Sequence, residues 1–447
     1  MTRRAPVSAP EALGVAVLTL AFAGQALRNL VGWWGYAAVV AVLLGFTIAA
    51  LARARPRLRW SNTPKALVGF LVVAVLSIAW SFYPGASALG VAATLATTAA
   101  GAMLAYTLDW DQFVRAMGRA LRITVGASLL FELVVAVFVR QPVLPPWIGA
   151  PAGTTPDAFY WTLGELFTGG PIQGVVGNRN LLGFVALLGL VVVLVELVAG
   201  LLRRRGAIVW AVVFAATLLL TRSSTVWLCL VAVAATAVFV LWARRVGENR
   251  RRPVYITALA LGVALLVVLL TARDAVFAVL GRSEDATGRL DIWRSVWALA
   301  EQRPVAGWGW VSYWVPWAAP FDSLAERKGV LYLQAHNAWL DVWFQLGIIG
   351  LVFFVALAVS ALWRSWFLAV DRPRRSASAV LPYRIATVAP VLILAALLAQ
   401  SIAESRILTE SGWMLLAAFA LKTKSRPENT TAELVDAASP RRATVGR

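Results

Sequence analysis

The sequence predicts an all-α membrane protein with about twelve transmembrane helices. Hydrophobic residues make up 60% of the chain, charged residues only 14%, and the mean hydropathy is +0.74. Many apolar runs reach the roughly 18–20 residues that cross a hydrocarbon core. These runs lack the polar–apolar alternation of a membrane β-barrel. Helices are therefore the expected spanning elements, because they satisfy their own backbone hydrogen bonds in lipid.

The apolar runs predict the spans in order. They are residues 11–27, 32–51, 66–83, 86–106, 121–139, 180–201, 207–221, 225–242, 254–271, 344–362, 385–403 and 411–421. The last run is short, and its helix is expected to begin earlier. The first run follows two arginines and resembles a signal peptide. We expect it to be a retained helix, because a second span follows within a few residues.

Basic residues predict how the spans are oriented. Of the 41 lysines and arginines, 29 fall at the two termini and in alternate loops on their side, and 12 fall on the other side. Basic loops stay in the cytoplasm, so both termini are predicted to be cytoplasmic in a cytoplasmic-membrane protein. The same bias accounts for most of the net charge of +19 without a nucleic-acid partner.

The chain is predicted to form one transmembrane domain, residues 1–424, followed by a polar, disordered tail, residues 425–447. Two long loops, residues 140–179 and 272–343, are expected outside the cell. We expect the second loop to carry the active site.

Part of the second loop, from Thr287 to Gln302, is predicted to be helical. Five residues fall at helical spacing and are expected to form one apolar face: Ile292, Trp293, Val296, Trp297 and Ala300. Tryptophan favours the interface between membrane and water, so this helix should lie along the outer membrane surface.

The second loop also holds the only histidine, His336. An imidazole can take a proton from a hydroxyl near neutral pH, so His336 is the candidate general base. The alternative is an interfacial histidine that caps the tenth helix. The single cysteine, Cys229, lies in an apolar run, which excludes an internal disulfide and a thiolate zinc cluster. We predict neither a metal nor a cofactor.

Arginines on the outer side are candidate anion ligands. Arg222 lies between two apolar runs with almost no loop, where a guanidinium is costly unless it faces a polar cavity or an anion. Its donors match phosphate oxygens. Snorkelling to the interface is the alternative. Arg289 and Arg282 lie on the same side, and a local pair with Asp291 is the alternative for Arg289.

Acidic residues in or near the spans are weaker candidates. Glu404 and Arg406, at the outer end of the eleventh span, are expected to support the same cavity. Glu132 and Glu196 lie inside spans, and a structural or pocket-lining role is favoured over a proton relay. The Asp-x-Asp triplet at 109–111 resembles a metal-binding pattern of glycosyltransferases, but a solvated helix start is favoured.

The order and sidedness of several motifs resemble the O-antigen ligase and Wzy-type polymerase superfamily. The motifs are GNRNLLGF with Asn180 and Gly183, the outer Arg222, GRLDIW with Arg289 and Trp293, PVAGWGW with Gly307 and Gly309, and HNAWLDVWFQLGIIGL with His336 and Asn337. The family often shows Ser-Arg at the hairpin, whereas here Arg222 precedes Ser223 and Ser224.

The resemblance implies a metal-independent, inverting glycosyltransferase of the GT-C type. Such proteins move a glycan from an undecaprenyl-pyrophosphate carrier to an acceptor hydroxyl at the outer face of the membrane. Carried over, Arg222 and Arg289, with Arg282, would bind the pyrophosphate, and His336 would be the base, with Asn337 in support. The implied partners are the lipid-linked donor, membrane lipids and a lipid, glycan or protein acceptor.

Two competing functions remain open from the sequence. A Wzy-type polymerase would use the same donor with a glycan-lipid acceptor. A transporter or flippase of a lipid-linked anion would show two related halves with broken helices at matching places. The sequence shows one long, late outer loop instead.

Overall fold

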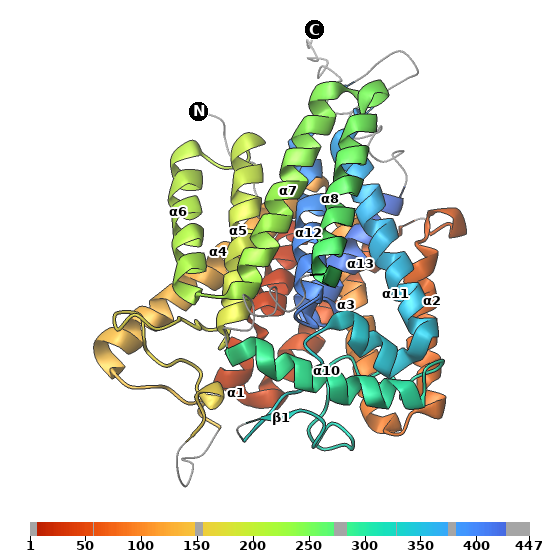
Figure 1. Cartoon of the computed structure of the whole chain (residues 1–447). Coiled ribbons are helices and arrows are strands. Elements are labelled where there is room, and N and C mark those ends of the chain that lie inside the picture. Colours follow the sequence, from red (N-terminus) through yellow and green to blue (C-terminus); the bar gives the residue numbers. More distant parts are fainter. Residues whose placement is uncertain are drawn as a thin grey trace.

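The computed structural model describes residues 7–56, 58–147, 155–271, 284–327, 329–373 and 381–425. Most of these residues are helical. The elements are α1 (Ala9–Ala54), α2 (Lys65–Leu76), α3 (Pro84–Thr107), α4 (Trp110–Val134), α5 (Arg179–Val198), α6 (Arg204–Thr221), α7 (Ser224–Val246), α8 (Arg252–Thr271), α10 (Glu284–Gln302), β1 (Glu326–Arg327), β2 (Val330–Leu331), α11 (Ala338–Val370), α12 (Ala389–Ser401) and α13 (Glu410–Lys424). The long helices run side by side, and α10 lies across one end of the bundle (Figure 1).

The helices confirm a multi-pass, all-α membrane protein. Seven of them, α1, α3, α4, α5, α6, α7 and α11, are long and apolar enough to cross a membrane. Shorter apolar helices cover Lys65–Trp80, Arg252–Leu265 and Ile385–Ser401. The first two predicted spans are the two halves of α1, which are separated at Gly32 by a backbone φ of +71°. Each of the other ten predicted spans overlaps a helix. Twelve membrane crossings remain a prediction.

Helix α11 begins earlier than the predicted span at residue 344. The side chain of Asn337 caps it by accepting hydrogen bonds from the backbone N–H groups of Trp339 and Leu340. The helix is broken at Gly347, where φ is +62°. Loop residues pack into this break: the Ile348 amide donates to the carbonyl of Pro304 at 2.8 Å. The start of the tenth span is therefore joined to the outer loop.

The predicted surface helix is α10, and it starts a few residues before Thr287. Ile292, Val296 and Ala300 are buried as expected. Trp297 was expected on the same apolar face, but it is 53% exposed. Its ring packs against Trp343, with the ring centroids 4.7 Å apart. The buried apolar face of α10 is thus narrower than the helical spacing suggests, and the side chains on the opposite side of the helix are exposed.

The start of α1 and the end of α13 lie at the end of the bundle opposite α10. Glu11 pairs with Arg115 and Arg119 of α4, at 3.1 and 2.9 Å. Lys422 of α13 donates to the carbonyl of Ala105 at 3.1 Å, just before α4. These segments, which the basic residues predict on one side, therefore lie at one end of the bundle. That the α10 end faces outward remains a prediction from the positive-inside rule.

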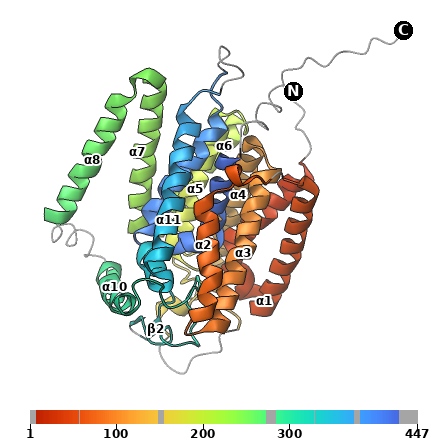
Figure 2. The same ribbon diagram turned by 90° about the vertical axis from the view of Figure 1, so that its right-hand side faces the viewer.

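Helices α7 and α8 form a hairpin at the edge of the bundle, and α8 leans away from the remaining helices (Figure 2). The apolar side chains of α8 are correspondingly exposed, among them Ile256 and Leu259. Such exposure is expected where a helix faces lipid.

Candidate functional site

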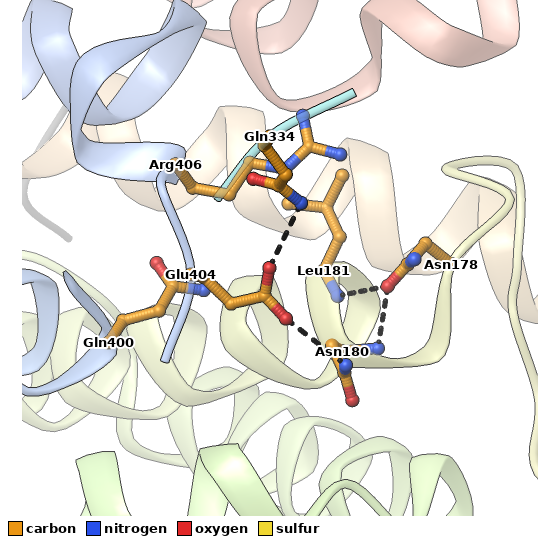
Figure 3. A pocket seen from close by; sticks show the side chains of 7 residues that line it. All are labelled: Asn178, Asn180, Leu181, Gln334, Gln400, Glu404 and Arg406. Atoms are coloured by element: carbon orange, nitrogen blue, oxygen red, sulfur yellow. Dashed lines mark hydrogen bonds between the residues drawn. The ribbon is translucent and has the colours of Figure 1, made fainter. Parts of the chain in front are cut away.

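Glu404 is the centre of the candidate site. It follows α12 and is only 5% exposed. Its carboxylate accepts hydrogen bonds from His336 Nδ1 at 2.9 Å and Arg289 Nη2 at 2.9 Å. It also accepts from Gln334 Nε2 at 3.1 Å and Asn180 Nδ2 at 3.3 Å, as Figure 3 shows. One carboxylate therefore joins four segments that are far apart in sequence: the start of α5, α10, the loop before α11 and the turn after α12.

The carboxylate of Glu404 is held in its ionised form. Burial, the largest effect, would raise its pKa, but the positive charges of His336 and Arg289, with Arg406, lower the pKa to about 2. Glu404 is therefore an anion throughout the physiological pH range.

His336 is oriented by this contact. Its side chain is mostly buried, and its backbone has a left-handed φ of +50°, which is uncommon for a residue other than glycine. In the neutral ring, an Nδ1–H that donates to Glu404 leaves the lone pair on Nε2. A histidine held by a carboxylate in this way can accept a proton at Nε2 and be stabilised as the imidazolium.

Arg289 of α10 connects the surface helix to the rest of the site. Besides its bond to Glu404, Arg289 Nη1 lies 3.5 Å from Thr225 Oγ1 at the start of α7. The predicted alternative, a local pair with Asp291, does not form. Asp291 instead pairs with Arg294 at 2.8 Å on the exposed side of α10. The local pairing fails because Arg289 points toward the bundle.

Arg222 directly precedes a residue that is bonded to this network. It ends α6 with a left-handed φ of +48°, and its side chain is exposed. Among the described residues, no carboxylate forms an ion pair with it. The next residue, Ser223, donates to Asn180 Oδ1 at 2.7 Å, and Asn180 in turn donates to Glu404. The α6–α7 turn is therefore joined to the Glu404 cluster, while the Arg222 guanidinium itself lies near Gly169 of the first outer loop.

The first outer loop, residues 140–179, packs against the α6–α7 turn. Glu132 of α4 is buried and accepts hydrogen bonds from the Thr162 hydroxyl and from the amides of Gln173 and Gly174. The amide of Ile172 donates to a carbonyl in the last turn of α6 at 3.3 Å. Glu132 thus fixes the loop that packs against the α6–α7 turn, which agrees with the structural role favoured from the sequence.

Arg406 lines a small polar pocket together with Glu404 and five further residues, Asn178, Asn180, Leu181, Gln334 and Gln400 (Figure 3). Its ion-pair partner is Glu410, at 3.7 Å, and Glu410 is bound more closely by Arg28, at 2.7 Å.

Asn337 and Arg282 are the two remaining predicted site residues. The side-chain oxygen of Asn337 caps α11, so it is used in the helix start that carries His336. Arg282 lies outside the described residues.

Sequence reasoning missed Gln334 and Thr225 as site residues, and it noted Asn180 only as part of a motif. The signals were slight: Gln334 stands two residues before His336, and Thr225 follows Arg222 closely. Neutral polar side chains in loops are common. Only the packing of distant segments distinguishes those that face a buried carboxylate.

Comparison with known proteins agrees with the motifs. Residues 209–355 match the family model described as O-antigen ligase, a range that includes Arg222, Arg289 and His336. The chain is also similar to the "Exopolysaccharide production protein ExoQ" of Rhizobium meliloti (strain 1021), with 23% identity over 309 residues. That alignment covers 66% of this chain and 63% of the relative, which is less than two thirds of the relative's length.

Proposed function

We propose that this chain, a membrane protein of the O-antigen ligase and Wzy-type family that acts in polysaccharide biosynthesis, is a glycosyltransferase of the ligase type. It would move a glycan from an undecaprenyl-pyrophosphate carrier to an acceptor hydroxyl at the outer face of the cytoplasmic membrane. The observation that carries the proposal is the oriented histidine, His336 on Glu404, with Arg289 bound to the same carboxylate.

In the proposed reaction, Nε2 of His336 removes the proton of the acceptor hydroxyl. The hydroxyl oxygen forms a bond to the anomeric carbon, while the bond from that carbon to the pyrophosphate oxygen breaks. The electron pair leaves with the pyrophosphate. A single displacement inverts the anomeric carbon, and Glu404 stabilises the imidazolium that forms.

The two arginines would contribute differently to leaving-group stabilisation. Arg289 is already neutralised by Glu404, so it can donate further N–H groups while adding little net charge. Arg222 forms no ion pair among the described residues, and it would supply the positive charge that the pyrophosphate needs. Arg289, held by Glu404, would therefore orient the pyrophosphate. Arg222, at the α6–α7 turn, would supply the positive charge.

A Wzy-type polymerase is the second candidate, since the name of the relative refers to exopolysaccharide production. It would use the same groups on a different acceptor. A transporter is less well supported, because the polar cluster described above lies at the α10 end of the bundle, whereas a transporter is expected to bind its substrate near the middle of the membrane.

The test uses the full-length protein in lipid nanodiscs with a fluorescent glycan on undecaprenyl pyrophosphate. Separate reactions offer no acceptor, a lipid-borne hydroxyl acceptor, or excess donor. A single transferred glycan supports a ligase, and a ladder of products supports a polymerase. If donor is bound but no glycan is transferred in any reaction, while protein-loaded vesicles move the donor between leaflets, the glycosyltransferase proposal is wrong.

The orientation can be tested independently. Ser295 is exposed on α10, and Ser61 is exposed between α1 and α2 at the opposite end. The native Cys229 is buried and gives little background. In intact cells we expect Ser295→Cys, but not Ser61→Cys, to react with a membrane-impermeant maleimide. The reverse labelling would place the site in the cytoplasm.

A further inference from the structure

A second hollow lies apart from the candidate site, between the two halves of α1, α3 and α13. We call it the α1–α3 groove. Its walls are largely apolar and include Val17 and Leu20 from the first half of α1, and Val40 and Leu43 from the second half. The break at Gly32 lets the two halves lie against the same neighbours. The groove exists because α1 doubles back on itself.

Small side chains keep the groove open. Ala21 of α1 and Ala96 and Ala100 of α3 lie on its surface, where larger residues would fill it. Along the second half of α1 it extends from Tyr36 to Thr47, which is about 16 Å of helix at 1.5 Å per residue. This is about the full depth of one leaflet of a hydrocarbon core, which is roughly 15 Å.

The groove has one polar end, which lies toward the α10 end of the bundle. Glu410 lines it there and pairs with Arg28 at 2.7 Å and with Arg406 at 3.7 Å. Two guanidinium groups around one carboxylate leave a net positive charge. Arg28 also lies over the rings of Tyr36, at 4.9 Å, and Trp33, at 5.3 Å. Aromatic rings beside a cation are typical of the headgroup level of a membrane.

The deeper part of the groove is mostly apolar, and its polar lining is limited to the hydroxyls of Thr47 and Thr97. The hydroxyl of Thr97 already donates to the carbonyl of Ala93 within its own helix. An ordered water needs two to four polar partners, whereas a hydrocarbon chain needs none. The apolar wall therefore favours a hydrocarbon chain, and the positive end favours a negatively charged head.

From these contacts we propose that the α1–α3 groove binds one acyl chain of an anionic membrane phospholipid, whose phosphate lies at Arg28 and Arg406. The site is separate from the proposed glycosyl transfer, and it does not depend on it. Because Arg406 also lines the polar pocket beside Glu404, the bound headgroup would lie next to the candidate site.

The experiment is native mass spectrometry of the full-length protein with phosphatidylglycerol, phosphatidylcholine or undecaprenyl phosphate added at matched concentrations. We expect phosphatidylglycerol to be retained in preference to phosphatidylcholine, whereas undecaprenyl phosphate, which the candidate site would bind, should be retained equally by Ala96→Phe and the wild type. Ala96→Phe should fill the groove and abolish this preference. Ala93→Phe, on the exposed side of α3, is the matched control and should keep it. Thermal unfolding of both variants checks that they are folded.

Charge variants test the headgroup site. Glu410→Gln removes the negative charge between the two arginines, so it should tighten phosphatidylglycerol binding by roughly fivefold, the effect of about 1 kcal/mol per charge near an anionic lipid. A purely structural role for Glu410 predicts no such gain. Equal retention of phosphatidylcholine, or unchanged phosphatidylglycerol binding in Ala96→Phe, would each overturn the proposal.

Discussion

Both ends of the bundle hold a buried glutamate paired with an arginine, yet the two arrangements differ in what they can do. At the end opposite α10, Glu196 is 1% exposed and is bound by both terminal nitrogens of Arg122, at 2.5 and 3.2 Å. At the α10 end, Glu404 is nearly as buried and binds Arg289. Only Glu404 also holds a histidine.

The comparison shows that a buried ion pair does not by itself mark a functional site. The Glu196 pair is closed: both carboxylate oxygens bind one guanidinium, and Gly118 packs directly against the carboxylate. The Glu404 carboxylate instead distributes its bonds over several groups and faces a pocket. Site chemistry requires groups that can change protonation or bind a further ligand, and of these two clusters the one around Glu404 provides them.

The largest effect is expected from His336→Ala. Loss of the general base should lower the rate of glycan transfer by about 10²–10⁴-fold. Donor binding should remain close to that of the wild-type protein, because Arg289 and Arg222 are still present, whereas thermal stability should fall somewhat, because the buried Glu404 loses a hydrogen bond. Single-turnover transfer and donor binding are measured on the same preparation. Full transfer by a stable variant would remove His336 from the mechanism.

The next largest effect is expected from Glu404→Gln, which keeps the size of the side chain but removes the charge that orients and stabilises the imidazolium. We expect kcat to fall by about 10²-fold, as for a misplaced catalytic group, with a smaller change in KM. An unchanged kcat would mean that the contact between Glu404 and His336 is only structural.

The Glu404→Gln variant should also change how thermal stability depends on pH. The pKa of Glu404 is lowered from 4.5 to about 2 in the folded protein, so its ionisation stabilises the fold above pH 4.5. This stabilisation is lost as the pH falls from 4.5 toward 2. The wild-type Tm should therefore exceed that of Glu404→Gln at neutral pH, and the difference should shrink in this acidic range. A difference that grows as the pH falls would contradict the assignment.

Arg222→Gln is expected to have a smaller and more selective effect. Losing one charge-assisted hydrogen bond to phosphate costs about 1.5–3 kcal/mol, which corresponds to roughly 10- to 100-fold weaker donor binding. Stability should change little, because the side chain is exposed. Arg294→Gln, also exposed but on the outer side of α10, is the control. Equal donor affinity in Arg222→Gln and the wild type would exclude Arg222 from the site.

The smallest effect on activity is expected from Glu196→Gln at the opposite end. Leaving Arg122 without its partner should lower the free energy of unfolding by about 3 kcal/mol. Transfer per folded molecule should stay the same. Circular dichroism melting and activity normalised to folded protein separate the two quantities. A large loss of specific activity would show that the two ends are coupled.

Much of the fold followed from simple patterns. The lengths of the apolar runs gave the positions of the helices, because a helix must be long enough to cross the hydrocarbon core. Helix edges were less accurate where polar side chains set them: Asn337 starts α11 before residue 344. The pattern also placed Trp297 on the buried face of α10, where the structure leaves it exposed. Helical spacing predicts which residues lie on the same side of a helix, but not how many of them are buried.

The sequence alone determined that the chain is an all-α membrane protein with its arginines divided between two sides, because hydrophobic length and charge act locally along the chain. It also singled out His336, Arg222 and Arg289 as candidates. Only the tertiary structure decided that Glu404 joins His336 to Arg289, since these residues come from segments far apart in sequence. Such contacts depend on how loops fold over the bundle, and no periodicity or composition encodes that.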